Sequence, residues 1–133
     1  MASKAVEDAI TDHLQANWTR CPIMVENTQG DAPNDGSPFI VLQFPMSITV
    51  RRTISDRVYW EAGGFRIIIN VASGEGTDTI REWGAELAVM FRDQQIGPVN
   101  CRTPTEPFTD MGADRGNYWQ GSMVVTYDYA FFG

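Results

Sequence analysis

The chain has 133 residues, a formal net charge of −7 at pH 7 and one histidine. That length suits a single domain over residues 1–133, which can bury roughly two-thirds of the surface that the unfolded chain exposes. The hydrophobic share of 43% argues against disorder. The net negative charge disfavours binding to nucleic-acid phosphates. No apolar run approaches the ~20 residues that cross a bilayer, and the N-terminus lacks a signal-peptide core. We therefore expect a soluble intracellular protein.

Two amphipathic segments predict helices. The first runs from Lys4 to Trp18, with Ser3 as a candidate N-cap. Its apolar residues recur at four-residue spacing: Val6, Ile10, Leu14 and Trp18. The second runs from about Asp78 to Arg92. Its buried stripe is Ile80, Trp83, Leu87 and Phe91, and Gly84 and Ala88 allow close approach to a sheet.

Strands are predicted between these helices. Cys21 to Glu26 is a short strand, and the polar stretch Asn27 to Pro38 is a surface loop. Phe39 to Phe44 is an apolar strand that Pro45 interrupts, which implies a bend or an edge position. Ser47 to Ile54 then resumes as a strand.

The next apolar runs flank a glycine pair. Val58 to Ala62 and Phe65 to Val71 read as strands on either side of Gly63 and Gly64. Paired glycines suit both a hairpin and one long bulged strand, so both remain open.

After the second helix, Val99 to Thr103 is a strand and Pro104 to Gly116 a long polar loop. The last segment, Asn117 to Phe132, alternates with period two and is more than twice the usual strand length of ~5–6 residues. Such a strand could extend past the body of the domain. The element order α-β-β-β-α-β-β predicts an α+β fold: a mixed, mostly antiparallel sheet with two helices packed on one face.

The chain carries no recognisable catalytic, cofactor or metal site. Asp31 to Gly36 resembles a calcium loop, but its proline and the missing terminal glutamate break the EF-hand spacing. Gly74 to Gly76 lies between a strand and a helix, where Glu75 and Asp78 would repel a phosphate and no lysine is present. His13 is a surface or boundary residue of the first helix, without a partner in the sequence pattern.

The two cysteines, Cys21 and Cys101, belong to no metal or redox spacing. We expect free thiols, and a disulfide between them stays open without geometry.

The whole pattern resembles the tail-terminator, or minor tail, proteins of long-tailed bacteriophages. The segments that carry the resemblance are Ala5–Ile10, Phe39–Leu42, Gly64–Val71, Gly74–Gly76, Trp83–Ala88 and Gly116–Gln120, followed by the alternating final strand. They span nearly the full chain, by order, size and spacing rather than by a sharp signature.

The resemblance implies an assembly role in the virion and no enzyme activity. Such proteins form a ring, usually hexameric, on the head-proximal end of the tail tube. They stop tube polymerisation and present a surface to the head-tail connector. The implied partners are copies of the same chain, the tail tube protein and the connector protein, with assembly in the host cytoplasm. The resemblance implies no cofactor.

A ring needs heterologous surfaces that fit each other. The candidate contact residues are Arg51, Arg52 and Arg57, with Tyr127, Tyr129 and Phe131 of the final strand, against Asp110 and Asp114 of an acidic loop. The arginines could instead be solvated, and the aromatic run could instead be a core face.

Two other functions remain open from the sequence: another neck protein, such as a head-completion or connector subunit, and a small-molecule-binding domain whose aromatic residues line a pocket.

Overall fold

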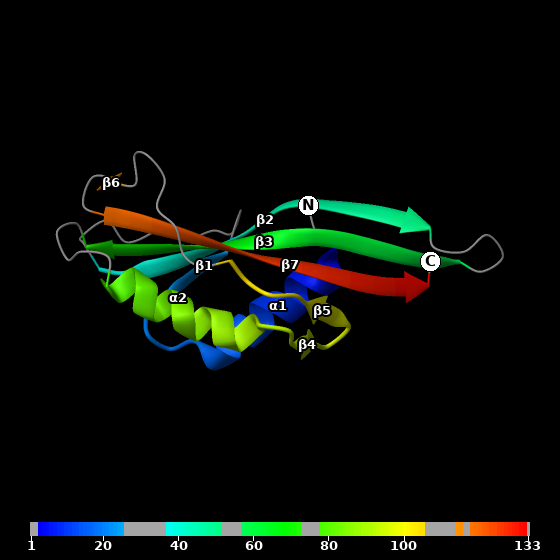
Figure 1. Ribbon diagram of the computed structural model, residues 1–133, viewed down its shortest axis with the longest axis horizontal. Helices are drawn as coiled ribbons and strands as arrows, with labels where there is room; N and C mark the ends of the chain where they lie inside the picture. Colours follow the sequence, from blue (N-terminus) through cyan, green and yellow to red (C-terminus); the bar gives the residue numbers. More distant parts are fainter. Residues whose placement is uncertain are drawn as a thin grey trace.

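The computed structural model describes residues 3–25, 37–51, 57–72, 78–105, 114–115 and 118–132 (Figure 1). In chain order the elements are α1 (Lys4–Asn17), β1 (Ile23–Val25), β2 (Phe39–Arg51), β3 (Val58–Ala72), α2 (Asp78–Phe91), β4 (Gln95–Ile96), β5 (Val99–Cys101), β6 (Asp114–Arg115) and β7 (Tyr118–Phe132). The predicted α+β order is confirmed, and the structure adds the short strands β4 and β6.

One sheet holds the described strands in the order β1-β2-β3-β7-β5-β4, and β6 pairs with β7 off this path. β1 is parallel to β2, whereas the other pairs are antiparallel. The sheet is therefore mixed and mostly antiparallel, as predicted. Its centre is the β3–β7 pair, whose register runs without a break from Val58↔Phe132 to Ala72↔Tyr118.

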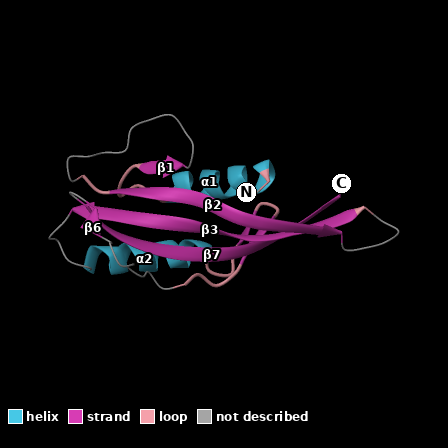
Figure 2. Cartoon of the chain, turned by 90° about the horizontal axis from the view of Figure 1, so that it is seen from above, coloured by secondary structure: helices cyan, strands magenta, loops and turns pink. Residues whose placement is uncertain are grey.

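α1 and α2 cover one side of this curled sheet. In Figure 1 both lie below the strands, and Figure 2 shows α1 along the β2 side and α2 along the β7 side. The fully buried side chains of α1 are Val6, Ile10 and Leu14, in the same core as Ile40, Leu42, Phe65, Ile67, Ile69, Met123 and Val125 of the sheet and Leu87 and Phe91 of α2. Alternation along the strands sends these sheet residues to the helix side.

The glycine pair lies within one continuous strand. Gly63 and Gly64 are central residues of β3, with β7 partners Tyr127 and Thr126, so the hairpin alternative is wrong.

The pairing of the long strands is interrupted at Pro45 of β2, not at the glycine pair of β3. The β2–β3 register shifts between Gln43↔Arg66 and Met46↔Gly64, so Phe44 and Pro45 together oppose Phe65. This extra residue is a β-bulge, which tolerates a proline because the ladder is interrupted there. β1 pairs with β2 only as far as Leu42, so among the described residues Pro45 has the edge position that was one of the two predictions. One strand spans both of the segments predicted for β2.

Other boundaries differ by small amounts. α1 ends at Asn17 and α2 at Phe91, each one residue earlier than predicted. β6 lies inside the predicted loop from Pro104 to Gly116, and two residues are too few to show a period. Residues 26–36 and 73–77, which include the calcium-like loop and the glycine turn, lie outside the described residues.

Neither α1 nor α2 has the length and hydropathy of a membrane-spanning helix.

Candidate assembly surface

The long strands run past α1 and α2 at one end of the molecule (Figures 1 and 2). Fourteen helical residues rise about 21 Å. Fifteen residues of β3 or β7 span about 50 Å. The helices are therefore too short to cover the strands. We call this end of the sheet, residues 47–51, 58–62 and 128–132, the sheet extension.

A buried carboxylate fastens the base of the sheet extension to α1. Glu61 is 2% exposed. Its Oε2 accepts a hydrogen bond from the Tyr127 hydroxyl at 2.7 Å and another from the backbone N–H of Ser3 at 3.2 Å. Ser3 occupies the predicted N-cap position of α1, but its side chain makes no capping bond. Burial, and then the bond to Glu61, raise the pKa of Tyr127. The Glu61 side chain thus joins β3 and β7 to the N-terminus of α1.

Replacing Tyr127 with phenylalanine is expected to lower the free energy of unfolding by about 1–3 kcal/mol, because Glu61 would lose a donor inside the protein. Urea unfolding at pH 7 would measure the change. Because the pKa of Tyr127 is raised, the folded state favours the neutral phenol, and this adds to the free energy of unfolding. The added stability is present in full below the ordinary tyrosine pKa of about 10 and is lost as pH rises towards the pKa of the folded state. Tyr129→Phe, at a partly exposed ring, is the matched control, and an equal loss there would contradict the expectation.

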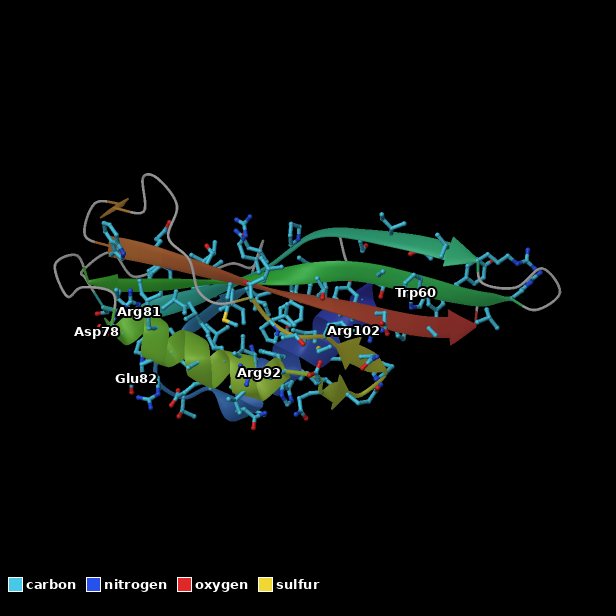
Figure 3. All side chains as sticks on the ribbon, viewed as in Figure 1. Trp60, Asp78, Arg81, Glu82, Arg92 and Arg102 are labelled. Atoms are coloured by element: carbon cyan, nitrogen blue, oxygen red, sulfur yellow. The ribbon has the colours of Figure 1, made fainter. Side chains whose placement is uncertain are left out.

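The face of the sheet extension turned away from the helices is apolar and exposed. Ile48 is 60% exposed and Val50 is 44% exposed. The register pairs Ile48 with Ala62 and Val50 with Trp60, so these four side chains share one face. Figure 3 labels Trp60 on this part of the molecule, far from Asp78 at the start of α2.

A shallow apolar hollow of about 370 Å³ lies at the base of this face. Its lining is Pro45, Ile48, Ala62, Gly63, Gly64, Val124 and Thr126. Gly64 leaves part of the floor without a side chain. The carboxylate of Asp128, on the same face of β7, is ion-paired with Arg102.

Aromatic rings occupy the other face near the tip. The ring of Phe131 stacks on Tyr59 at 5.6 Å and on Tyr129 at 5.3 Å between centroids. All three are partly exposed. The sheet extension therefore presents apolar side chains on both faces.

The structure places part of the predicted contact set on the sheet extension. Arg51 is exposed at the end of β2, opposite Tyr59, and Arg57 is exposed just before β3. Arg52 and Asp110 lie outside the described residues. Asp114 belongs to β6, paired in register with Trp119 of β7, so the backbone places it at the other end of β7 from the tip.

The aromatic candidates divide in two. Tyr127 is 2% exposed and belongs to the core, whereas Tyr129 and Phe131 are on the sheet extension. The sequence offered both a core face and an exposed flank for this strand, and β7 contains both.

The exposed pair Ile48 and Val50 was missed as a contact candidate. Its only signal was an alternating β-branched run in a strand that α1 and α2 are too short to cover.

A second hollow, of about 860 Å³, lies between the end of α1 and α2. It is lined by Asn17, Trp18, Thr19, Arg20, Ala85, Glu86, Val89 and Met90. Arg20 and Glu86 are the two charged residues in this lining. Arg20 donates two hydrogen bonds of 2.6 Å to the Glu86 carboxylate, so these two charges are paired with each other. Among the described residues, Trp18 is the one aromatic residue in this lining, and Trp119, Tyr127, Tyr129 and Phe131 of β7 do not contribute to it.

His13 and the two cysteines lie in structural surroundings. His13 lies 3.3 Å from the Met90 carbonyl through Nε2 and contacts Phe91 edge-on, which joins α1 to α2. Both cysteines are free thiols, as expected. Burial raises the pKa of Cys21 and raises that of Cys101 to about 12, so neither is an activated nucleophile. Within the described ranges, no cluster of His, Cys, Asp or Glu is placed to bind a metal.

The described residues thus form an α+β domain whose long strands carry exposed apolar side chains past the helices. A family model described as phage tail terminator protein matches residues 5–127. The chain therefore belongs to the phage tail terminator family, and its role in phage tail assembly is structural.

The other comparisons concern the fold and the sequence. Twelve chains of solved structures match significantly. One of them, a protein that carries only a sequence identifier as its name, has 19% sequence identity and a TM-score of 0.61. That match covers 100% of this chain and 99% of the other, and at this identity it supports the fold alone. Among curated proteins, no sequence matches significantly.

Proposed function

We propose that this protein forms a ring on the head-proximal end of the tail tube, ends tube polymerisation and provides the surface to which the head is joined. The family match over residues 5–127 carries this proposal. The resemblance noted in the sequence implies a hexamer, with copies of the chain, the tail tube protein and the head-tail connector as partners. The protein would act in the virion tail after assembly in the host cytoplasm.

The charge and the described side chains are consistent with this role. A net charge of −7 gives a ring that would not hold DNA as it passes through the bore. Glu86 is paired with Arg20, Cys101 is buried, and Glu61 is buried and bonded to Tyr127. None of these three side chains is arranged as a nucleophile next to a base. We therefore propose a function without catalysis.

Deletion of the gene in the phage that encodes this protein tests the proposal. Electron micrographs should show tails of abnormal length without heads, because nothing would stop the tube from growing. Tails of normal length that lack heads would instead indicate a head-completion or connector subunit. Normal particles would contradict every neck function.

The small-molecule alternative has its own outcome. Its premise was a pocket lined by the aromatic strand, and the larger hollow has a different lining. A ligand that copurifies with a monomer would favour it over the ring.

Charge reversal at Arg51 and Arg52, to glutamate at both positions, is expected to impair ring formation, since opposite charges steer and register subunits. Native mass spectrometry of rings, or tail morphology with the variant, would measure the effect. Lys4→Glu, at an exposed cation on α1, is the control. Normal assembly by the Arg51/Arg52 variant would remove the arginines from the contact.

A further inference from the structure

We propose that the helix-free face of the sheet extension is the surface that binds a second copy of this chain. The proposal rests on the proposed ring, because a ring requires each copy of the chain to contact another copy. It assigns that contact to the face that carries Ile48, Val50, Trp60 and the apolar hollow next to Gly64.

The first reason is that the sheet extension is incomplete by itself. A sheet in a soluble domain usually packs one face against a core and leaves a polar face to water. Here the helix-free face carries Ile48 and Val50, at 60% and 44% exposure, and the opposite face carries the stack of Tyr59, Tyr129 and Phe131. Exposed apolar side chains grouped on one face of a sheet are typical of a surface that another protein covers.

The second reason is that, within the described residues, the sheet extension has an unpaired edge on each side. β1 pairs with β2 only at Ile40 to Leu42, and β5 pairs with β7 only at Tyr127 and Asp128. Among the described residues, no strand lies beyond β2 at Ile48 to Val50, or beyond β7 at Tyr129 and Ala130. Both strands are antiparallel to β3 and so run in the same direction. One copy thus presents two different edges at the same end, as a heterologous contact requires.

The third reason is charge, and it selects a second copy as the occupant. Arg51 at the end of β2 and Arg57 just before β3 are both exposed, in a chain of net charge −7. A basic tip on an acidic chain is attracted to the rest of another copy. Among the described residues, the exposed acidic side chains that could attract this basic tip include Asp12 on α1 and Asp78 and Glu82 on α2.

The hollow gives this contact an anchor point. Interfaces gain most of their affinity from a few apolar side chains that fill pockets near the centre. The hollow beside Gly64, with Ala62 and Thr126 in its lining, has a volume of about 370 Å³, which is large enough for such a side chain.

Two variants test the assignment, and neither should disturb the monomer. Ile48→Lys places a charge on the face at a position that is 60% exposed. Gly64→Val fills the floor of the hollow, and a Cβ there would meet its nearest atom, the Val125 carbonyl oxygen, at 3.4 Å, an ordinary contact. Val89→Lys is the matched control, because Val89 is 65% exposed on α2 and lies away from the sheet extension.

Self-association of the full chain would be measured by sedimentation up to about 1 mM protein, which populates even a contact with a millimolar dissociation constant. Melting curves would confirm that each variant is folded. We expect self-association by the wild type, weakening by at least about tenfold in Ile48→Lys and in Gly64→Val, and no change in Val89→Lys.

Unchanged association of both variants would overturn the assignment, as would a wild type that stays monomeric at the highest concentration. Equal weakening by Val89→Lys would move the contact to α2. Binding of a different protein to this face without self-association would also overturn it. Tails of abnormal length in the gene deletion, together with normal association of both variants, would leave the terminator function standing and reject only this surface.

Discussion

Alanine in place of Phe65 is expected to lower the free energy of unfolding by about 3–5 kcal/mol, the usual cost of truncating a buried phenylalanine. Phe65 is fully buried on β3. Its ring contacts Phe91 of α2 at 5.0 Å and Phe44 of β2 at 6.0 Å between centroids. It faces the bulge of β2, so the cavity would open where three elements meet.

Calorimetry would measure the effect of Phe65→Ala as a fall in Tm of about 10–20 °C for a domain of this size. Ile48→Ala is the control, since its side chain is 60% exposed and should cost less than about 0.5 kcal/mol. A fall of only a few degrees in Phe65→Ala would contradict the placement of this ring at the centre of the core.

Valine in place of Gly121 is expected to lower the free energy of unfolding by about 1–3 kcal/mol or more, because it overpacks the contact between β7 and α2. A Cβ on Gly121 would lie 2.5 Å from Cγ2 of Ile80, closer than real Cβ contacts come. Either the helix would shift away from the sheet, or Ile80, itself 2% exposed, would change rotamer.

Gly64→Val supplies the matched control for Gly121→Val. Both glycines are in long strands, but the nearest atom to a Cβ on Gly64 is 3.4 Å away. Urea unfolding should show little loss for Gly64→Val, since valine also has the higher strand propensity. Equal losses at the two positions would mean that α2 does not pack closely over Gly121.

Periodicity predicted most of the fold. The four-residue spacing of Val6, Ile10 and Leu14 is a stripe facing one core, and all three are fully buried in α1. The alternation of Met123, Val125 and Tyr127 likewise marked the buried face of β7. Such a pattern shows that one face of the helix or strand is buried. It does not depend on which other element of the fold covers that face.

The hairpin question depended on pairing rather than on local preference. Gly63 and Gly64 permit a turn, but β7 pairs with β3 through both of them, and this long ladder keeps the strand continuous. The β2–β3 pairing also places the extra residue in β2 at Pro45, across from Phe65. No sequence pattern within β3 contains that information.

The candidate surface was predicted only in part. Clustered charge drew attention to Arg51 and Arg57, and both are exposed near the tip of the sheet extension. The period of β2 put Ile48 and Val50 on one face, but it could not tell whether a helix covers that face. The answer depends on how far α1 and α2 reach along the strands, which is a property of the assembled layers.

The most direct measurement is the length distribution of tail tubes growing from purified tail tube protein, read by electron microscopy with and without this protein. If the protein ends polymerisation as a ring, substoichiometric amounts added during growth should arrest elongation, and a ring should cap one end of each tube. Tubes that continue to grow at the same rate, with no density at either end, would contradict the account.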